Sequence, residues 1–428
     1  MNIAKIKYNY NIVRLSVPFF LISSVNAIAE LVDVWLASSL STENTAFIGF
    51  LYRLFFFYGA FQIAFTSSTT IRLNKYYSNG KVHQFYSYLL NNVIINLILA
   101  FLFSMICYKF RDSIFSNLPA YSDSFLILFL IWIFILSILS PFSFAIIAIG
   151  YKSYATKVSI ISLSIKVASS LLLFFKFDLG LNALIIGTLI SIVVSFLLIS
   201  FKLIVTLFKD VNIRDISLRL INYKDFLIDS SNLLWSLSIG TGFNLLLVSL
   251  MKENNELLAI YNLYFSFGMI VLGLFTSSGT YFSLEMAKLN CEKEIEKLKV
   301  DIYEYGIFLS VIVIVICFPV LVALYSNFLD ISAVTSFVVI LTLLSMIFSG
   351  YQALLTRAIV RALRYTSIIS KVSTKTNIAK AISLLPLLTI FGMIDDIEVY
   401  FFTTLLFCLI YAFSVTSKHT KSLVSYNG

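Results

Sequence analysis

The sequence of 428 residues is poor in charged residues, histidine and cysteine. Only 12% of its residues are charged, whereas a soluble domain has about a quarter. Its two histidines, His83 and His419, lie in basic polar segments, and its four cysteines lack metal-ligand or redox spacing. A nucleotide-binding loop is also missing. These absences argue against an enzyme, so we expect a protein without catalytic residues, metal site or cofactor.

Hydrophobic residues are abundant instead, at 59% of the chain. Apolar runs of about 20 residues, the length at which an α-helix crosses a hydrocarbon core of roughly 30 Å, occur twelve times. The runs are continuous rather than alternating, which favours helices over a barrel. We therefore predict an all-α polytopic membrane protein with twelve transmembrane helices, at residues 17–37, 47–71, 88–108, 125–149, 158–177, 183–208, 227–251, 257–282, 307–325, 333–359, 372–391 and 399–417.

The distribution of basic residues predicts the orientation. If the N-terminus is cytoplasmic, the inner segments hold most of the 31 Lys and Arg residues, and the outer segments hold four, which are Lys109, Arg111, Lys176 and Lys252. The positive-inside rule then predicts a multi-pass protein of the plasma (inner) membrane with both termini in the cytoplasm. Because this orientation explains the net charge of +9, we expect membrane lipids and no nucleic acid as partners.

Two stretches of the first half recur in the second half. A shift of 210 residues aligns TENTAFIGFLYRLFFFYGAFQIAFTSSTT, at 42–70, with KENNELLAIYNLYFSFGMIVLGLFTSSGT, at 252–280. A shift of 214 residues aligns KVSIISLSIKVASSLLLFFKF, at 157–177, with KVSTKTNIAKAISLLPLLTIF, at 371–391. The chain therefore contains an internal repeat.

The repeat predicts two six-helix bundles of the same orientation, in which Lys166 and Lys380 occupy equivalent places. Parallel repeats of this kind are typical of transporters, whose substrate site lies between the halves. The predicted parts are an N-terminal lobe at 1–208, a cytoplasmic linker at 209–225 and a C-terminal lobe at 226–428.

A few charged residues lie inside the apolar spans. Each costs at least about 2.5 to 3.5 kcal/mol near the bilayer centre unless it faces protein, water or a partner, so each is a candidate functional residue. Lys375 lies about one turn from the inner helix end and is explained by snorkelling. The others are candidate substrate or coupling-ion residues, with structural ion pairs or helix packing as the alternative: Asp33, Glu30, Arg53, Lys166 and Lys380.

Spacing relates three of these candidates. Glu30 and Asp33 are three residues apart, which puts both carboxylates on one face of a helix. Asp33 lies roughly five residues from the outer end of the first span and Arg53 roughly six residues from the outer end of the second, so both are at similar depth. An ion pair between Asp33 and Arg53 is therefore geometrically reasonable.

The first two spans and the loop after them contain the stretches LSVPFFLISSVNAIAELVDVWLASSL, TAFIGFLYRLFFFYGAF and TSSTTIRLNKYYSNGK. These stretches resemble the first two helices of the multidrug and toxic compound extrusion (MATE) family. MATE proteins belong to a superfamily that also contains flippases for polysaccharide and peptidoglycan precursors. The resemblance implies a two-lobed inner-membrane exporter that is driven by proton or sodium entry and opens alternately to each side.

The resemblance also assigns residues. Asp33 matches the aspartate of the family's cation site, whereas Lys166 and Ser170 stand where the family often has an asparagine and an aspartate. An ammonium beside Asp33 would compete with a bound cation, so the resemblance makes Na⁺ coupling doubtful and leaves H⁺ as the expected coupling ion. On this interpretation, Lys166 is the counter-charge to Asp33.

Two functions remain open at this point. The first is a cation-coupled exporter of a small molecule or peptide, and the second is a flippase for lipid-linked oligosaccharide or polysaccharide precursors. Of the six charged residues named above, four are basic and two are acidic, which favours an anionic cargo. The pattern of the first two spans favours the exporter.

Overall fold

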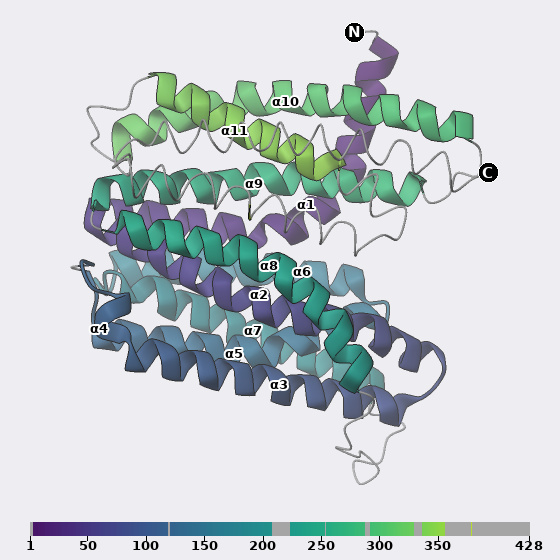
Figure 1. Cartoon of the computed structure of the whole chain (residues 1–428), viewed down its shortest axis with the longest axis horizontal. Helices are drawn as coiled ribbons and strands as arrows, with labels where there is room; N and C mark the ends of the chain where they lie inside the picture. Colours follow the sequence, from purple (N-terminus) through teal and green to yellow (C-terminus); the bar gives the residue numbers. More distant parts are fainter. Residues whose placement is uncertain are drawn as a thin grey trace. The chain divides into compact units, whose positions relative to one another are not determined.

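The computed structural model describes residues 3–118, 120–207, 223–252, 254–286, 292–328, 336–355 and 378. All regular secondary structure in this part of the chain is α-helical (Figure 1). The helices are α1 (Ile3–Ser38), α2 (Thr42–Ser78), α3 (Val82–Lys109), α4 (Arg111–Ile114), α5 (Asp123–Ala148), α6 (Lys152–Phe175), α7 (Asn182–Leu207), α8 (Tyr223–Met251), α9 (Asn255–Met286), α10 (Glu292–Phe328) and α11 (Ser336–Leu355).

Each of the first ten predicted spans overlaps one of these helices. The last two predicted spans lie outside the described residues, apart from residue 378, as does most of the predicted linker. The prediction of an all-α protein is confirmed for the described residues, while the total of twelve helices in two six-helix lobes stays a prediction. The single helical turn α4 was not predicted, because four residues are too few to form an apolar run.

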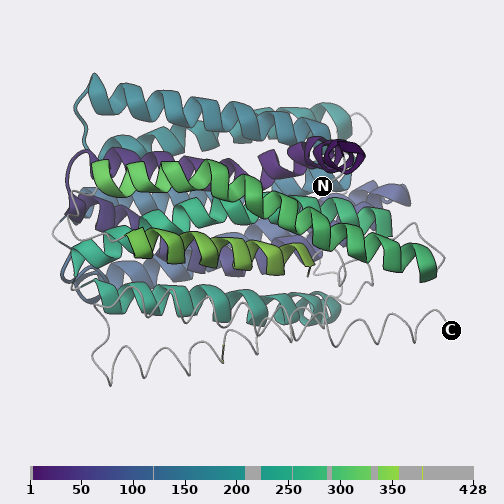
Figure 2. The same cartoon turned by 90° about the horizontal axis from the view of Figure 1, so that it is seen from above.

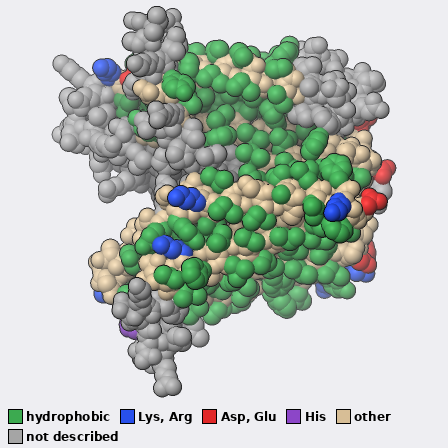
Figure 3. Space-filling view, turned by 180° about the vertical axis from the view of Figure 1, so that it is seen from behind, with side chains coloured by type: hydrophobic (Ala, Val, Ile, Leu, Met, Phe, Trp, Pro, Cys, Tyr) green, Lys and Arg blue, Asp and Glu red, His purple; other side chains and the backbone are tan. Residues whose placement is uncertain are grey.

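Seven helices of the described ranges are long and apolar enough to cross a membrane. Apolar side chains cover much of the described surface in Figure 3, and charged side chains are sparse there. On α3, for example, Phe101, Leu102, Met105 and Ile106 are each at least half exposed. Such a surface is unfavourable in water and suits a hydrocarbon environment.

Contacts divide the chain into two compact units, which we call unit 1 and unit 2. Unit 1 contains Met1–Thr42 and Asn254–Gly428, and unit 2 contains Glu43–Glu253. Helix α1 therefore belongs to the same unit as α9, and α8 belongs to the same unit as α2 to α7. The predicted lobes follow the sequence repeat rather than these contacts, and they remain a prediction.

In unit 1, α9 packs against α1 and α11, and α10 packs against α11 (Figure 1 and Figure 2). Two close approaches depend on glycine. A Cβ added at Gly350 of α11 would collide with the ring of Phe275 on α9, and one added at Gly306 of α10 would collide with the ring of Tyr351 on α11. The absence of a side chain at these positions lets the helices approach closely.

In unit 2, α7 packs against α5 and α6, and α3 packs against α5. Polar side chains also join α2 to its neighbours. Tyr58 shares a hydrogen bond with Ser137 of α5, and Gln62 donates to a carbonyl of α5 at 3.2 Å. Asn92 of α3 donates to the carbonyl of Phe65 at 3.4 Å. Interhelical hydrogen bonds in a membrane each contribute about 0.6 to 2 kcal/mol, so α2 is held on two sides.

Candidate functional site

The two predicted carboxylates are fully buried on α1. Glu30 is 0% exposed and Asp33 is 2% exposed. The continuous helix places them on the same face, as their spacing predicts. Both residues belong to unit 1.

Glu30 is hydrogen-bonded to α9. The hydroxyl of Ser266 donates to Oε1 of Glu30 at 2.7 Å. The same hydroxyl lies 2.9 Å from the carbonyl oxygen of Asn262, one helical turn earlier. Because a hydroxyl has one proton to donate, Ser266 can serve only one of these two acceptors at a time. Ser266 and Asn262 are themselves 0% exposed.

The predicted cations Arg53 and Lys166 are buried in unit 2, on α2 and α6. Lys166 is 6% exposed, and its Nζ donates to the hydroxyl of Tyr52 at 3.0 Å. The guanidinium of Arg53, which is 1% exposed, lies 5.6 Å from the ring centroid of Phe56. A buried ammonium needs such polar and aromatic partners, because its desolvation is costly.

Aromatic residues surround Tyr52. The indole of Trp132 on α5 meets the ring of Tyr52 edge-on at 6.0 Å and stacks on the ring of Phe55 at 4.3 Å. Phe129 packs against the same indole at 5.7 Å. This aromatic group fixes the Tyr52 ring, so its hydroxyl is held in place for Lys166.

Ser170, on α6, is 0% exposed and lies against α7. A Cβ added at Gly187 of α7 would collide with the Ser170 side chain. A small residue at 170 therefore permits the close packing of α6 on α7, at the position where the resemblance would place an aspartate.

Among the described residues, the buried acidic side chains belong to one unit and the buried basic side chains to the other. The carboxylates Glu30 and Asp33 belong to unit 1, and the cations Arg53 and Lys166 belong to unit 2. Proximity of Asp33 to Lys166 or Arg53 therefore stays a prediction. Lys380 and Lys375 lie outside the described residues.

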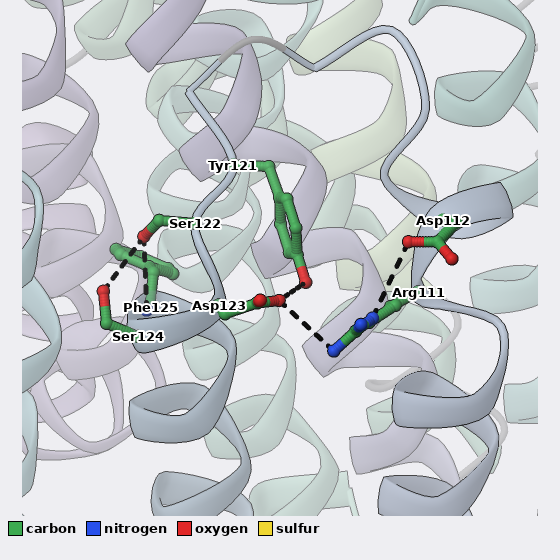
Figure 4. A network of polar contacts seen from close by, with 7 residues as sticks. All are labelled: Arg111, Asp112, Tyr121, Ser122, Asp123, Ser124 and Phe125. Carbon is green, nitrogen blue, oxygen red and sulfur yellow. Dashed lines mark hydrogen bonds and ion pairs between the residues drawn. The ribbon is translucent and has the colours of Figure 1, made fainter.

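A polar network organises the loop between α3 and α5 (Figure 4). The Arg111 guanidinium lies 3.5 Å from Asp123 and 3.6 Å from Asp112, and the Tyr121 hydroxyl donates to Asp123 at 2.7 Å. The Asp123 carboxylate raises the pKa of Arg111 above its usual value. Burial, followed by the hydrogen bond to Asp123, raises the pKa of Tyr121 to about 12.

Lys252, which follows α8, reaches the same loop. Its Nζ donates to the carbonyl oxygen of Ser113 at 3.1 Å and to the hydroxyl of Ser116 at 2.8 Å. Both acceptors lie between α3 and α5. The described residues contain no group of three or more His, Cys, Asp or Glu side chains that could hold a metal ion.

Comparison with known proteins identifies the fold. The model of the MatE family matches residues 18–172. No curated protein matches the sequence. Among solved structures, an inward-facing multidrug resistance MATE family transporter of the MOP superfamily is 15% identical, with a TM-score of 0.70 over 97% of this chain and 99% of that chain. The chain has the MATE transporter fold.

Two further structures share the MATE fold with this chain. A mutant of the Vibrio cholerae MATE transporter VcmN is 16% identical, with a TM-score of 0.69 over 100% of this chain and 99% of that chain. A MOP superfamily transporter from Pyrococcus furiosus is 15% identical, with a TM-score of 0.60 over 96% of each chain. The binding pocket of the Pyrococcus furiosus transporter has reverse polarity, which suggests a different function for that protein.

These comparisons confirm the resemblance to the MATE family that the first two spans predict. Together with the apolar helices, the MATE fold indicates a multi-pass membrane protein. The buried charges were predicted from the sequence, whereas Ser266 and Tyr52, which contact Glu30 and Lys166, were not. A usable signal existed for Ser266, because Asn262 and Ser266 are polar residues four apart within an apolar span.

Proposed function

We propose that the chain is a secondary active membrane transporter, a MATE-like exporter that exchanges cargo for a coupling cation by alternating access. The observation that carries the proposal is the pair of buried carboxylates, Glu30 and Asp33, on α1 of a MATE fold. Carboxylates inside a membrane protein are costly to keep and mark ion or proton pathways. The internal repeat adds support, because parallel repeats are an architecture of alternating access.

The coupling ion in this proposal is H⁺. Lys166 stands where related proteins often have an uncharged ligand, and a fixed ammonium near Asp33 would oppose Na⁺. The 210-residue shift places Gly240 and Phe243 opposite Glu30 and Asp33, so the second half has no matching carboxylates. Coupling therefore belongs to the first half.

The proposed cargo is anionic. Arg53 and Lys166 are both nearly inaccessible to solvent, and an anion could offset part of the cost of burying such cations. Lys380 is the proposed third cation, from the second half. The cargo would be a small molecule or a peptide with a negative group.

The second candidate is a flippase for lipid-linked oligosaccharide or polysaccharide precursors, whose phosphate groups are also anionic. The buried cations Arg53 and Lys166 support this alternative as they support the first, because they would offset the charge of such phosphate groups. In both proposals the protein is in the plasma (inner) membrane with cytoplasmic termini, and its lobes are 1–208 and 226–428, joined by the linker 209–225.

In the proposed cycle, Lys166 is the counter-charge to Asp33, and proton entry neutralises Asp33 and releases the lysine. Before proton entry Lys166 is paired with Asp33, so Arg53 holds the anionic group of the cargo, and cargo leaves in exchange for the proton. The test is transport by purified protein in vesicles with an imposed pH gradient. Asp33→Asn should abolish proton-driven transport while leaving the protein in the membrane. Asp178→Asn, in the loop between α6 and α7, is the matched control and should leave transport unchanged.

Lys166→Gln supplies the second arm of the test. An ammonium favours the ionised form of a nearby carboxylate, so its removal should move the pH optimum of transport to higher pH. Lys176→Gln, just after α6, is its control. Parent rates and parent pH profiles in both Asp33→Asn and Lys166→Gln would contradict the coupling role. Movement of a fluorescent lipid-linked sugar across the same vesicles, without proton-driven export of small anions, would favour the flippase.

A further inference from the structure

Two hydrogen-bonded contacts join the two sequence halves. In unit 1, Ser266 of the second half donates to Glu30 of the first half at 2.7 Å. In unit 2, Lys252 of the second half donates to Ser113 and Ser116 of the first half at 3.1 and 2.8 Å. Each contact therefore connects helices or loops that lie more than 100 positions apart in the sequence.

Both contacts lie toward the outer side in the predicted orientation. Lys252 lies between α8 and α9, and Ser113 and Ser116 lie between α3 and α5. Both of these connections are outer loops when the N-terminus is cytoplasmic. Glu30 is roughly 12 Å along α1 from its outer end at Ser38, at 1.5 Å per residue.

The two contacts differ in environment. Glu30 and Ser266 are buried, so their hydrogen bond is shielded from water, and a carboxylate acceptor makes it stronger than a bond between neutral groups. Lys252 makes its two bonds at the surface, where each one contributes less. The lysine bridges two acceptors on one loop, however, and an ion pair between Arg111 and Asp123 joins the two ends of this loop.

We propose that Ser266 and Lys252 are further residues of the transport machinery. The buried Ser266–Glu30 contact, which we call the inner latch, and the contacts of Lys252 with Ser113 and Ser116, which we call the rim latch, must break each time the outer side opens. This inference rests on the proposed alternating-access function. If the sequence halves move relative to one another, contacts that join the halves on the outer side cannot persist in an outward-open state. Neither Ser266 nor Lys252 needs to touch the cargo, so both are positioning residues.

The first experiment locks the rim latch. Ser116→Cys and Lys252→Cys are combined in a background without native cysteines and joined by a cleavable bifunctional thiol reagent as long as a lysine side chain. The cross-link should reduce transport in vesicles at least tenfold, and cleaving the reagent should restore it. The native cysteines to be replaced by serine are Cys107, Cys291, Cys317 and Cys408.

A matched control pair lies in the same loop. Arg111 and Asp123 are 3.5 Å apart and both belong to the first half, so they should not separate during transport. Cross-linking Arg111→Cys to Asp123→Cys with the same reagent should leave transport unchanged. Transport at the parent rate with the Ser116–Lys252 cross-link in place would overturn the rim latch.

A distance measurement separates the latch from the proposed function. Spin labels at positions 116 and 252 should give two distances whose populations change on addition of cargo or a change of pH, whereas labels at 111 and 123 should give one. If the protein shows two label distances but does not transport, the exporter proposal is contradicted, while the movement of the sequence halves relative to one another is supported. A single, unchanging distance between 116 and 252 would overturn the latch even in an active protein.

The inner latch is tested through the same labels. Ser266→Ala removes the hydroxyl that donates to Glu30, and the loss of one hydrogen bond to a charged group should favour the long label distance by about tenfold or more. Ser266→Thr keeps a hydroxyl and should restore the parent populations. Equal populations in the parent, Ser266→Ala and Ser266→Thr would show that this contact does not hold the outer side closed.

Discussion

Tyr52→Phe isolates the hydrogen bond that holds the buried ammonium of Lys166. The substitution removes one oxygen, the acceptor 3.0 Å from Nζ, and keeps the ring that lies 5.7 Å from the same ammonium. The ring also keeps its edge contact with Trp132. A hydrogen bond to a charged group contributes about 1.5 to 3 kcal/mol, so we expect the variant to lose up to this amount of stability.

The assay is thermal unfolding of purified protein in detergent, compared with Tyr10→Phe, which alters a 63% exposed tyrosine. We expect Tyr52→Phe to unfold a few degrees below the parent and Tyr10→Phe to match it. A double-mutant cycle with Lys166→Met makes the test specific, because Tyr52→Phe should cost little once the ammonium is gone. Equal effects of Tyr52→Phe with and without Lys166 would refute the hydrogen bond as the source of the stability.

Other expectations follow from packing and from the outer loop. Gly350→Ala should destabilise the protein by about 1 to 3 kcal/mol, because its Cβ collides with the buried Phe275 ring, whereas Gly59→Ala, with nothing within 4 Å, should cost far less in the same unfolding assay. Tyr121→Phe should lower thermal stability at pH 8, and the difference in stability between the variant and the parent should shrink as the pH rises toward 12. The reason is that folding raises the pKa of Tyr121 from 10.0 to about 12, and this stabilisation is present below pH 10 and lost as pH rises through about 12. A margin that is constant from pH 8 to pH 12 would count against the raised pKa.

The helices were predictable because apolar runs of membrane length have few alternatives to a helix. Their ends were less predictable. Helix α2 runs from Thr42 to Ser78 and α10 from Glu292 to Phe328, well beyond the predicted spans 47–71 and 307–325. The additional turns are polar, and hydropathy does not indicate whether a polar segment continues a helix or leaves it.

The buried charged residues of the site could be predicted from the sequence, but the residues that contact them could not. Four of the five candidates, Glu30, Asp33, Arg53 and Lys166, lie in the described residues and are at most 6% exposed. The cost of intramembrane charge is a local property, so a single sequence reveals it. The partners Ser266 and Tyr52 come from other helices, and helix pairing depends on packing between distant segments that periodicity does not encode.

Glu30→Gln decides whether Glu30 is a coupling residue or only part of the contact with α9. The glutamine carbonyl oxygen can still accept a hydrogen bond from Ser266, which donates to Glu30 at 2.7 Å, so the contact between α1 and α9 should survive in weaker form. The variant cannot release or take up a proton. If Glu30 takes part in coupling, Glu30→Gln should change the pH profile of transport while the amount of folded protein stays the same. Glu43→Gln, at the exposed start of α2, is the control and should retain the parent profile. If Glu30→Gln transports with the parent pH profile, the coupling role falls to Asp33 alone, and the burial of Glu30 is explained by its hydrogen bond to α9.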